Sequence, residues 1–130
     1  MDEEIPEFIS QRVWAVVGAS TDPDKYGNKI FRTMRDAGYT VYGVNVHGGV
    51  IEGQPLYREL GELPETPAVV DTVVPPNVTE QVVQRCAELG ISRVWMQPGS
   101  ESEVAIEFCE ENGIQVVHHA CAMVRRQQWD

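Results

Sequence analysis

The sequence is short of positive charge. Of its 130 residues, 10 are Lys or Arg and 20 are Asp or Glu, which gives a formal net charge of −10. A general nucleic-acid or anionic-membrane binder needs a basic face, so this balance argues against both kinds of partner. It does not exclude a small anionic ligand, because a local site can carry a charge opposite to that of the whole chain.

Long apolar runs and closely spaced cysteines are also missing. No stretch comes near the ~18–20 consecutive apolar residues of a membrane-spanning helix. The first four residues, MDEE, lack the basic segment and apolar run of a secretory signal peptide. The three cysteines, Cys86, Cys109 and Cys121, form no CxxC pair, so we expect reduced thiols. These absences predict a cytoplasmic protein.

What is present is a regular alternation of β-rich runs and amphipathic helical segments. The predicted strands are Val13–Val17, Thr40–Val44, Ala68–Val74, Arg93–Met96 and Ile114–Val117. The predicted helices are Asn28–Ala37, Val78–Leu89, Glu101–Asn112 and a short one at Met123–Gln127. Such alternation is typical of βαβ units. We therefore predict an α/β, Rossmann-like single domain, with five mostly parallel strands and helices on both faces.

Two segments do not follow the alternation. Asn45–Pro67 is rich in Gly and Pro and offers only a possible short helix around Leu56–Leu60, so a full crossover helix is expected to be missing or shortened there. Residues 1–10 are interpreted as an N-terminal extension that packs on the sheet edge. Residues 11–130 then form the predicted domain.

In open α/β sheets, ligands bind beyond the carboxyl ends of the strands, so the loops after the strands are the candidates. In the first loop, Gly18 allows a tight turn and close backbone approach. Free amide groups near Ser20 and at the next helix start suit a phosphate. Lys25 and Lys29, the only lysines of the chain, both fall here. The candidate binding residues of this loop are Gly18, Ala19, Ser20, Lys25, Tyr26 and Gly27.

The first loop does not match the dinucleotide fingerprint GxGxxG, because Ser20 and Pro23 stand at its second and third glycine positions. The second predicted strand is followed by Asn45, where an NAD-binding unit would offer Asp or Glu to the ribose hydroxyls. An NAD(P)-binding sensor or small oxidoreductase is therefore kept as the alternative function.

Three further loops offer binding groups. Asn45 can hydrogen-bond a ribose or adenine edge, and His47 can contact a phosphate when protonated. The Pro75-Pro76 step forms a stiff apolar wall that can flank a flat ring, with Asn77 as a helix N-cap. In the fourth loop, an amide side chain, a glycine for close approach and two serines, at positions 100 and 102, that can cap the next helix stand together. The candidates are Asn45, Val46, His47, Val74, Pro75, Pro76, Gln97, Pro98, Gly99 and Ser100.

Candidates for catalysis or metal binding are few. Adjacent histidines on a strand, His118 and His119, point to opposite faces, whereas His119 and Cys121 can share one. A zinc site needs three or four ligands, and neither these residues nor the carboxylates of Glu101 and Glu103 form an obvious further pair. A Cys121–His119 dyad also lacks a visible oxyanion-stabilising device. We therefore predict no metal site and no catalytic residue.

Taken in order, these landmarks resemble the small stand-alone CoA-binding proteins, whose domain is similar to the N-terminal CoA-binding domain of the succinyl-CoA synthetase α subunit. The resemblance covers residues 11 to about 126. Its landmarks are WAVVGAS (14–20) with Lys25 and Gly27, AGYTVYGVN (37–45), IEGQPLY (51–57), VDTVVPP (70–76), VWMQPGSES (94–102) and Cys121 to Met123.

The resemblance implies a domain that holds coenzyme A across the strand ends. The loop at 18–20 and Lys25 would approach the diphosphate or the ribose phosphate, the segments 45–47 and 74–76 would flank the adenosine, and 97–100 would lie along the pantetheine. Two departures stand out. Val46 replaces a usual Pro that is often followed by a basic residue, which leaves His47 as the local cation, and the arginine often found before the Pro-Pro step is absent.

The synthetase relatives carry catalysis on other domains and subunits. The resemblance therefore implies non-catalytic binding of coenzyme A or an acyl-CoA, with a sensing, carrier or regulatory role and an open possibility of a protein partner.

Overall fold

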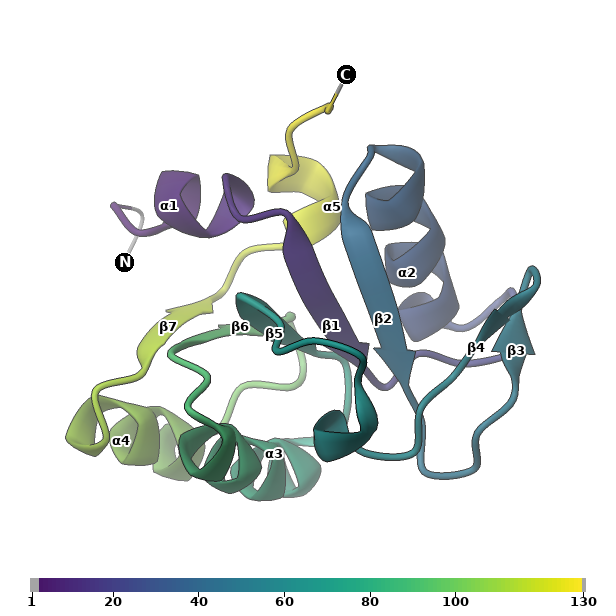
Figure 1. Ribbon diagram of the computed structural model, residues 1–130. Coiled ribbons are helices and arrows are strands. Elements are labelled where there is room, and N and C mark those ends of the chain that lie inside the picture. Colours follow the sequence, from purple (N-terminus) through teal and green to yellow (C-terminus); the bar gives the residue numbers. More distant parts are fainter. Residues whose placement is uncertain (1–2, 130) are drawn as a thin grey trace.

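The computed structural model describes residues 3–129; Met1, Asp2 and Asp130 lie outside the described residues, and with them half of the acidic MDEE start. A five-stranded parallel sheet with the order β2-β1-β5-β6-β7 forms its centre (Figure 1). The strands are β1 (Val13–Val17), β2 (Thr40–Val44), β5 (Val69–Thr72), β6 (Arg93–Met96) and β7 (Gln115–His118). The predicted Rossmann-like α/β fold is confirmed, although β5 ends two residues early and β7 is shifted by one.

Helices cover both faces of this sheet (Figure 1). On one face lie α1 (Ile5–Ile9), α2 (Tyr26–Asp36) and α5 (Ala122–Arg125), and on the other lie α3 (Pro76–Leu89) and α4 (Glu103–Glu111). The short helix α1 was not predicted. Its three apolar side chains are buried, and the Phe8 ring packs edge-on against Trp95 with centroids 6.1 Å apart. In the described residues, no helix has the length and apolarity that crossing a membrane requires.

The strands are apolar on both sides because each face has its own core. Trp14 and Val16 of β1 pack on the α2 side, whereas Ala15 and Val17 pack on the α3 side. Successive strand side chains point to opposite faces, so a sheet covered twice needs continuous apolar runs. Free thiols form part of the second core: Cys86 and Cys109 are buried, and burial raises the pKa of each to about 12.

The connection from β2 to β5 contains no α-helix, as the composition of this segment predicted. It forms a two-stranded antiparallel hairpin, β3 (Val50–Ile51) and β4 (Gln54–Pro55), and then a 3₁₀ turn, η1 (Leu60–Glu62). The possible short helix around Leu56–Leu60 is present only as η1, which begins at Leu60, and the hairpin was missed. Its two-residue turn, Glu52-Gly53, has positive φ at both positions, but it lacks the Asn-Gly or Asp-Gly pair that would have predicted it.

Candidate functional site

The carboxyl ends of β1 and β5 lie side by side where the strand order reverses. From β1 the chain passes through α2 to β2, and from β5 it passes through α3 to β6, on the opposite face and in the opposite direction. The loops that follow these two strands therefore run in opposite directions and leave a crevice between them. Open α/β sheets bind their ligands in such a crevice. The loops predicted to carry the site all meet at this edge.

The turn after β1 approaches its neighbours so closely that two glycines are required. Gly18 has a φ of +104°, and a Cβ atom there would overlap the carbonyl oxygen of Val73. A Cβ atom on Gly27 would overlap the carbonyl oxygen of Gly18 in the same way. The Gly18 amide donates to the Val44 carbonyl at 3.0 Å. The loops after β1, β2 and β5 are thus in backbone contact around Gly18.

Side chains of α2 hold the β1–α2 loop in shape. The Asn28 amide donates to the Ser20 carbonyl at 2.7 Å, and Arg32 Nε donates to Asn28 Oδ1 at 2.6 Å. Arg32 also donates to the Pro23 carbonyl at 3.3 Å. Neither residue was predicted from the sequence. Their spacing of four on one helix face was the available signal, but nothing in it shows that the pair reaches back to a loop.

The N-terminus of α2 presents amide groups beside this turn. Lys25 occupies the N-cap position with extended backbone, and no side chain caps the helix. The first amides of a helix have no acceptor within it, and the helix dipole adds partial positive charge there. The exposed Lys25 and Lys29 form no ion pair with any described residue. This corner therefore suits an anionic group.

Asn45 ties the second loop to the first. Its Nδ2 donates to the Ala19 carbonyl at 2.8 Å, and its Oδ1 accepts the His47 amide at 2.9 Å. The side-chain amide is thus already paired inside the protein, and its contact with a ribose or adenine edge stays a prediction. Val46 and His47 are exposed beyond it, with Val46 at 71% of its full accessible surface.

The loop after β5 forms the predicted proline wall. Pro75 is the N-cap residue of α3 and Pro76 begins the helix, so Asn77 lies in the first turn and is not the N-cap that we predicted. Proline fits the first helical position because its missing amide has no helical acceptor in any case. An open cavity of about 300 Å³ lies beside this wall. It is lined by Val73, Val74, Pro75, Pro98, Gly99 and Ser100.

In the loop after β6, some predicted residues brace the edge and others face the cavity. Ser100 is buried, and its hydroxyl donates to the Thr72 carbonyl at 2.9 Å and lies 2.8 Å from Thr72 Oγ1. Of the two serines predicted as caps, only Ser102 caps α4, by accepting the Ala105 amide at 3.2 Å. At Gly99 no atom lies within 4 Å of the Cβ position, so the backbone faces open space.

A buried carboxyl group lies beneath this edge. Asp71 is fully buried, and Gln97 Nε2 donates to both of its carboxylate oxygens at 2.8 and 2.9 Å. Burial raises the pKa of Asp71 well above its ordinary value, and the Gln97 hydrogen bond opposes that rise. Nearby, the Tyr26 hydroxyl lies 2.9 Å from Cys121 Sγ; burial and then this hydrogen bond raise the pKa of Tyr26 to about 12. Asp71 was not singled out from the sequence, although a lone acid inside an apolar strand was visible.

The sixteen predicted binding residues therefore share one edge but differ in exposure. Those exposed to solvent are Lys25, Tyr26, Val46, His47, Pro75, Pro76, Pro98 and Gly99. Those half-buried are Gly18, Ser20, Asn45 and Val74. Those buried are Ala19, Gly27, Gln97 and Ser100. The exposed side chains are accessible from solvent at this edge, whereas the buried ones pack inside the loops.

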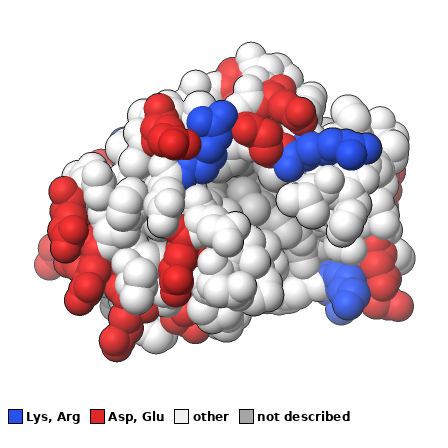
Figure 2. All heavy atoms as spheres, turned by 90° about the horizontal axis from the view of Figure 1, so that it is seen from below, with Lys and Arg blue, Asp and Glu red and all other residues white. Residues whose placement is uncertain are grey.

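A groove opens where the crossover helix is missing, on the α3 side of β1 and β2. Its volume is about 190 Å³, and its walls are largely apolar. The lining residues are Val17, Val44, Val46, Arg58, Glu59, Leu60, Val78, Gln81, Val82 and Arg85. Figure 2 views the molecule from below and shows a hollow near its middle, with blue Lys and Arg side chains at the rim and red acidic ones down the left side.

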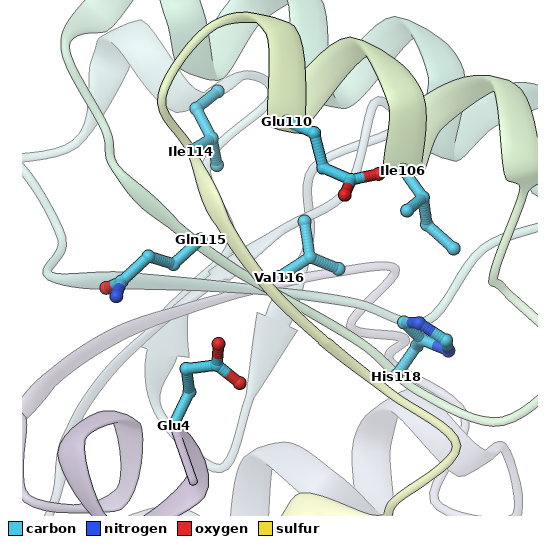
Figure 3. A pocket seen from close by; sticks show the side chains of 7 residues that line it. All are labelled: Glu4, Ile106, Glu110, Ile114, Gln115, Val116 and His118. Atoms are coloured by element: carbon cyan, nitrogen blue, oxygen red, sulfur yellow. The ribbon is translucent and has the colours of Figure 1, made fainter. Parts of the chain in front are cut away.

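Two larger hollows lie beside the edge strand β7, and acidic residues line both. Figure 3 shows the first, of about 360 Å³, with Glu4, Glu110 and His118 around it. The second, of about 560 Å³, shares Ile106 and His118 with the first. Its lining residues are Glu101, Glu103, Ile106, Glu107, His118 and His119. This acidic lining is unsuited to a polyphosphate ligand.

The two adjacent histidines do not point to opposite faces, so that prediction was wrong. Their ring centroids lie 4.3 Å apart, because His119 has a φ of 63° and follows the last residue of β7. Burial, followed by the neighbouring His119, lowers the pKa of His118. Within residues 3–129, no group of three or more His, Cys, Asp or Glu side chains is placed to hold a metal ion.

Comparison with known proteins connects this architecture to a family. A family model described as a CoA binding domain matches residues 12–127. The α subunit of the ADP-forming acetate–CoA ligase II from Pyrococcus furiosus is 27% identical over an alignment of 125 residues, and the match covers 88% of this chain and 27% of that subunit. The chain thus spans about a quarter of that relative. The uncharacterized protein YneT from Bacillus subtilis is 30% identical over an alignment of 126 residues, and the match covers 93% of this chain and 90% of YneT.

Solved structures show the same fold at nearly the same size. A conserved hypothetical protein from Pyrococcus furiosus has a TM-score of 0.83 at 42% identity, covering 87% of this chain and 97% of that one. A hypothetical protein from Pyrococcus horikoshii has a TM-score of 0.90 at 29% identity, covering 96% and 89%.

Proposed function

The chain belongs to the CoA binding domain family, and from this premise we propose that it binds coenzyme A or an acyl-CoA across the carboxyl edge of its sheet. The proposed role is binding without catalysis, as a cytoplasmic sensor, carrier or regulatory component. Residues 11–130 are the proposed binding unit, and α1 supports it by packing into the core.

One observation carries this proposal: directly beside the crowded turn at Gly18 lies an uncapped helix N-terminus with two lysines that pair with no acid in the part of the chain that the structure describes. Backbone amides and a helix dipole favour a phosphate group at such a position. Lys25 and Lys29 add full positive charge in a chain that is otherwise strongly acidic. The diphosphate of the ligand is therefore proposed to lie here.

The two neighbouring hollows suit the two ends of such a ligand. The apolar groove on the α3 side begins at Val46 and can take a flat base and its ribose. The cavity beside Pro98 and Gly99 is open to solvent and can take an extended pantetheine arm. A ligand lying along this edge would pass the Gly18 turn between the two.

The proposal that the chain itself is not catalytic follows from the groups at this edge. Asp71 and Gln97 are buried and paired with each other. Among the predicted binding residues and Lys29, the exposed polar side chains are two lysines, a histidine and a phenol that is hydrogen-bonded to a thiol. No base, nucleophile and oxyanion donor converge among the described residues at the edge.

The test is a thermal-shift comparison with coenzyme A, acetyl-CoA, NAD and NADP at equal concentrations. We expect the two CoA ligands to raise the melting temperature and the two nicotinamide nucleotides to leave it unchanged, because a ligand that binds only the native state stabilises it. Selective stabilisation by NAD or NADP would replace the proposal with the alternative of a nicotinamide-nucleotide sensor. Mass spectrometry of the ligand released on denaturing the purified protein gives an independent identification.

A further inference from the structure

The loop after β2, which contains His47, has no Lys or Arg. The fold brings an arginine to this loop from elsewhere in the chain. Gly48 has a φ of +68°, and a Cβ atom there would lie 3.4 Å from Arg58 Nε and 3.5 Å from Arg58 Nη2. The guanidinium group of Arg58 therefore lies against the backbone of the loop after β2. The sequence separates the two by ten residues and gives no sign of this contact.

Backbone pairing fixes Arg58 in this place. The Tyr57 amide donates to the Gly43 carbonyl at 2.9 Å, and the Asn45 amide donates to the Tyr57 carbonyl at 2.8 Å. The chain thus returns from the β3–β4 hairpin to run parallel to the end of β2, with Tyr57 opposite Val44. Arg58 follows directly and reaches the rim of the apolar groove.

The two arginines of this groove differ in what neutralises them. Arg85 donates to Glu59 at 3.1 Å and to Glu88 at 3.2 Å, so its charge is balanced. The guanidinium group of Arg58 has no ion-pair or hydrogen-bond partner among the described residues; the Glu62 carboxylate accepts only the backbone amide of Arg58, at 3.0 Å. The free positive charge at the groove is therefore that of Arg58.

We propose that Arg58 binds the phosphoryl group on the ribose of the ligand, and that it makes the site prefer 3′-phosphorylated coenzyme A over dephospho-CoA. This inference rests on the proposed function. A base and ribose seated in the groove, beside Val46 and Val78, place the ribose hydroxyls at the rim, where the guanidinium group stands. A guanidinium group matches a phosphate in charge and in its fork of donors.

The size of the preference follows from the exposure of Arg58. A charge-assisted hydrogen bond contributes more than a neutral one, but solvent weakens it at an exposed position. About tenfold in dissociation constant is the expected difference between coenzyme A and dephospho-CoA.

The experiment is a two-by-two cycle measured by isothermal titration calorimetry. Wild type and Arg58→Gln are each titrated with coenzyme A and with dephospho-CoA, and Arg125→Gln serves as the matched control, because Arg125 is an exposed arginine on α5, outside the groove. We expect Arg58→Gln to weaken coenzyme A about tenfold, to leave dephospho-CoA within twofold, and to leave the melting temperature unchanged. Arg58→Lys should keep part of the preference, because it keeps the charge.

The possible failures are distinguishable. If wild type binds both ligands but Arg58→Gln weakens them equally or not at all, the role of Arg58 is refuted and CoA binding stands. If Arg85→Gln instead removes the preference, the wrong arginine has been assigned. If wild type binds neither ligand, the proposed function itself fails.

Discussion

The carboxyl edge of the sheet has two halves that differ in charge and in packing. Around β1 and β2, glycine backbones meet their neighbours without space for a side chain. Lys25, Lys29 and Arg58 also lie there, and none of them forms an ion pair with another residue in the range 3–129. At the end of β7, a hollow of about 560 Å³ is lined by glutamates and by the pair His118 and His119. A second acidic hollow runs beside β7 from Ile114 to His118 (Figure 3). The same end of one small domain thus offers a cationic and an acidic recess.

This difference shows that neither net charge nor cavity size identifies the site. The net charge of −10 argues against anionic partners in general, but the acidic residues that line hollows are concentrated on the β7 side. The largest hollow there, about 560 Å³, is lined by glutamates and is expected to repel phosphates, whereas the groove of about 190 Å³ beside Arg58 is expected to attract them. The sign and the position of the charged side chains therefore distinguish the groove from the larger hollow as a candidate phosphate site.

The largest expected effect contrasts two glycines with positive φ: Gly18, in the turn after β1 at the carboxyl edge, and Gly113, in the turn that leads into β7 at the opposite end of the sheet. Gly18→Ala should destabilise the fold by about 3 kcal/mol or more, because the added methyl group meets the Val73 carbonyl in a backbone conformation that alanine disfavours. Gly113→Ala should cost about 1–2 kcal/mol, because its φ is +70° but nothing lies within 4 Å. Urea denaturation measures both. Equal costs would show that the β1 turn is not as crowded as described.

The next effect concerns Asp71, which lies on β5 between the two halves. Its folded-state pKa is raised, so the stability that it lends below its ordinary pKa is lost as pH rises through the folded pKa. Asp71→Asn removes this loss. Between the ordinary pKa and the folded-state pKa, its free energy of unfolding should therefore rise relative to that of wild type by about 1.4 kcal/mol per pH unit. Denaturation curves from pH 4 to pH 9 measure the difference. A constant difference at all pH values would mean that Asp71 does not change its ionisation on folding.

The sequence predicted the sheet and its edge because their signals are local. Short apolar strands and the first loop, with its two glycines, can each be recognised from about ten consecutive residues. Four of the five predicted strands agree with the structure to within one residue at each end. The fifth, predicted as Ala68–Val74, was too long, because its apolar run continues into the proline wall that ends the strand at Thr72.

What the sequence could not predict depends on contacts between distant segments. Arg58 at Gly48, Asn28 bonded to Ser20, and Gln97 bonded to Asp71 each become visible only when the chain is folded. Ser100 shows the same dependence on packing: the sequence offers a polar loop residue, and the structure shows that its hydroxyl donates to the Thr72 carbonyl, so its contact with a ligand stays a prediction. Residue type indicates which groups can bind, whereas packing decides which are free to do so.

A third prediction compares one charge from each half. Lys25→Ala should weaken binding of coenzyme A about tenfold, because a charge at the α2 N-terminus is lost while the side chain caps nothing. Glu107→Ala, an exposed acid beside the β7 hollow, should change it less than about twofold. Calorimetry under identical salt measures both. A stronger effect of Glu107→Ala than of Lys25→Ala would indicate that the ligand binds beside β7 and not beside β1.

The smallest expected effect is the response of binding to salt. The local cations attract coenzyme A, the acidic background repels it, and added salt screens both, over about 8–10 Å at ordinary ionic strength. Between 50 and 300 mM salt, the dissociation constant should therefore change by less than about threefold. Removing two acids from the β7 side, in the double variant Glu103→Gln and Glu107→Gln, leaves the attraction less opposed, so binding should tighten at low salt and weaken more steeply as salt rises. If wild type already loses affinity steeply, the cationic half acts alone, and the acidic half is too far from the ligand to matter.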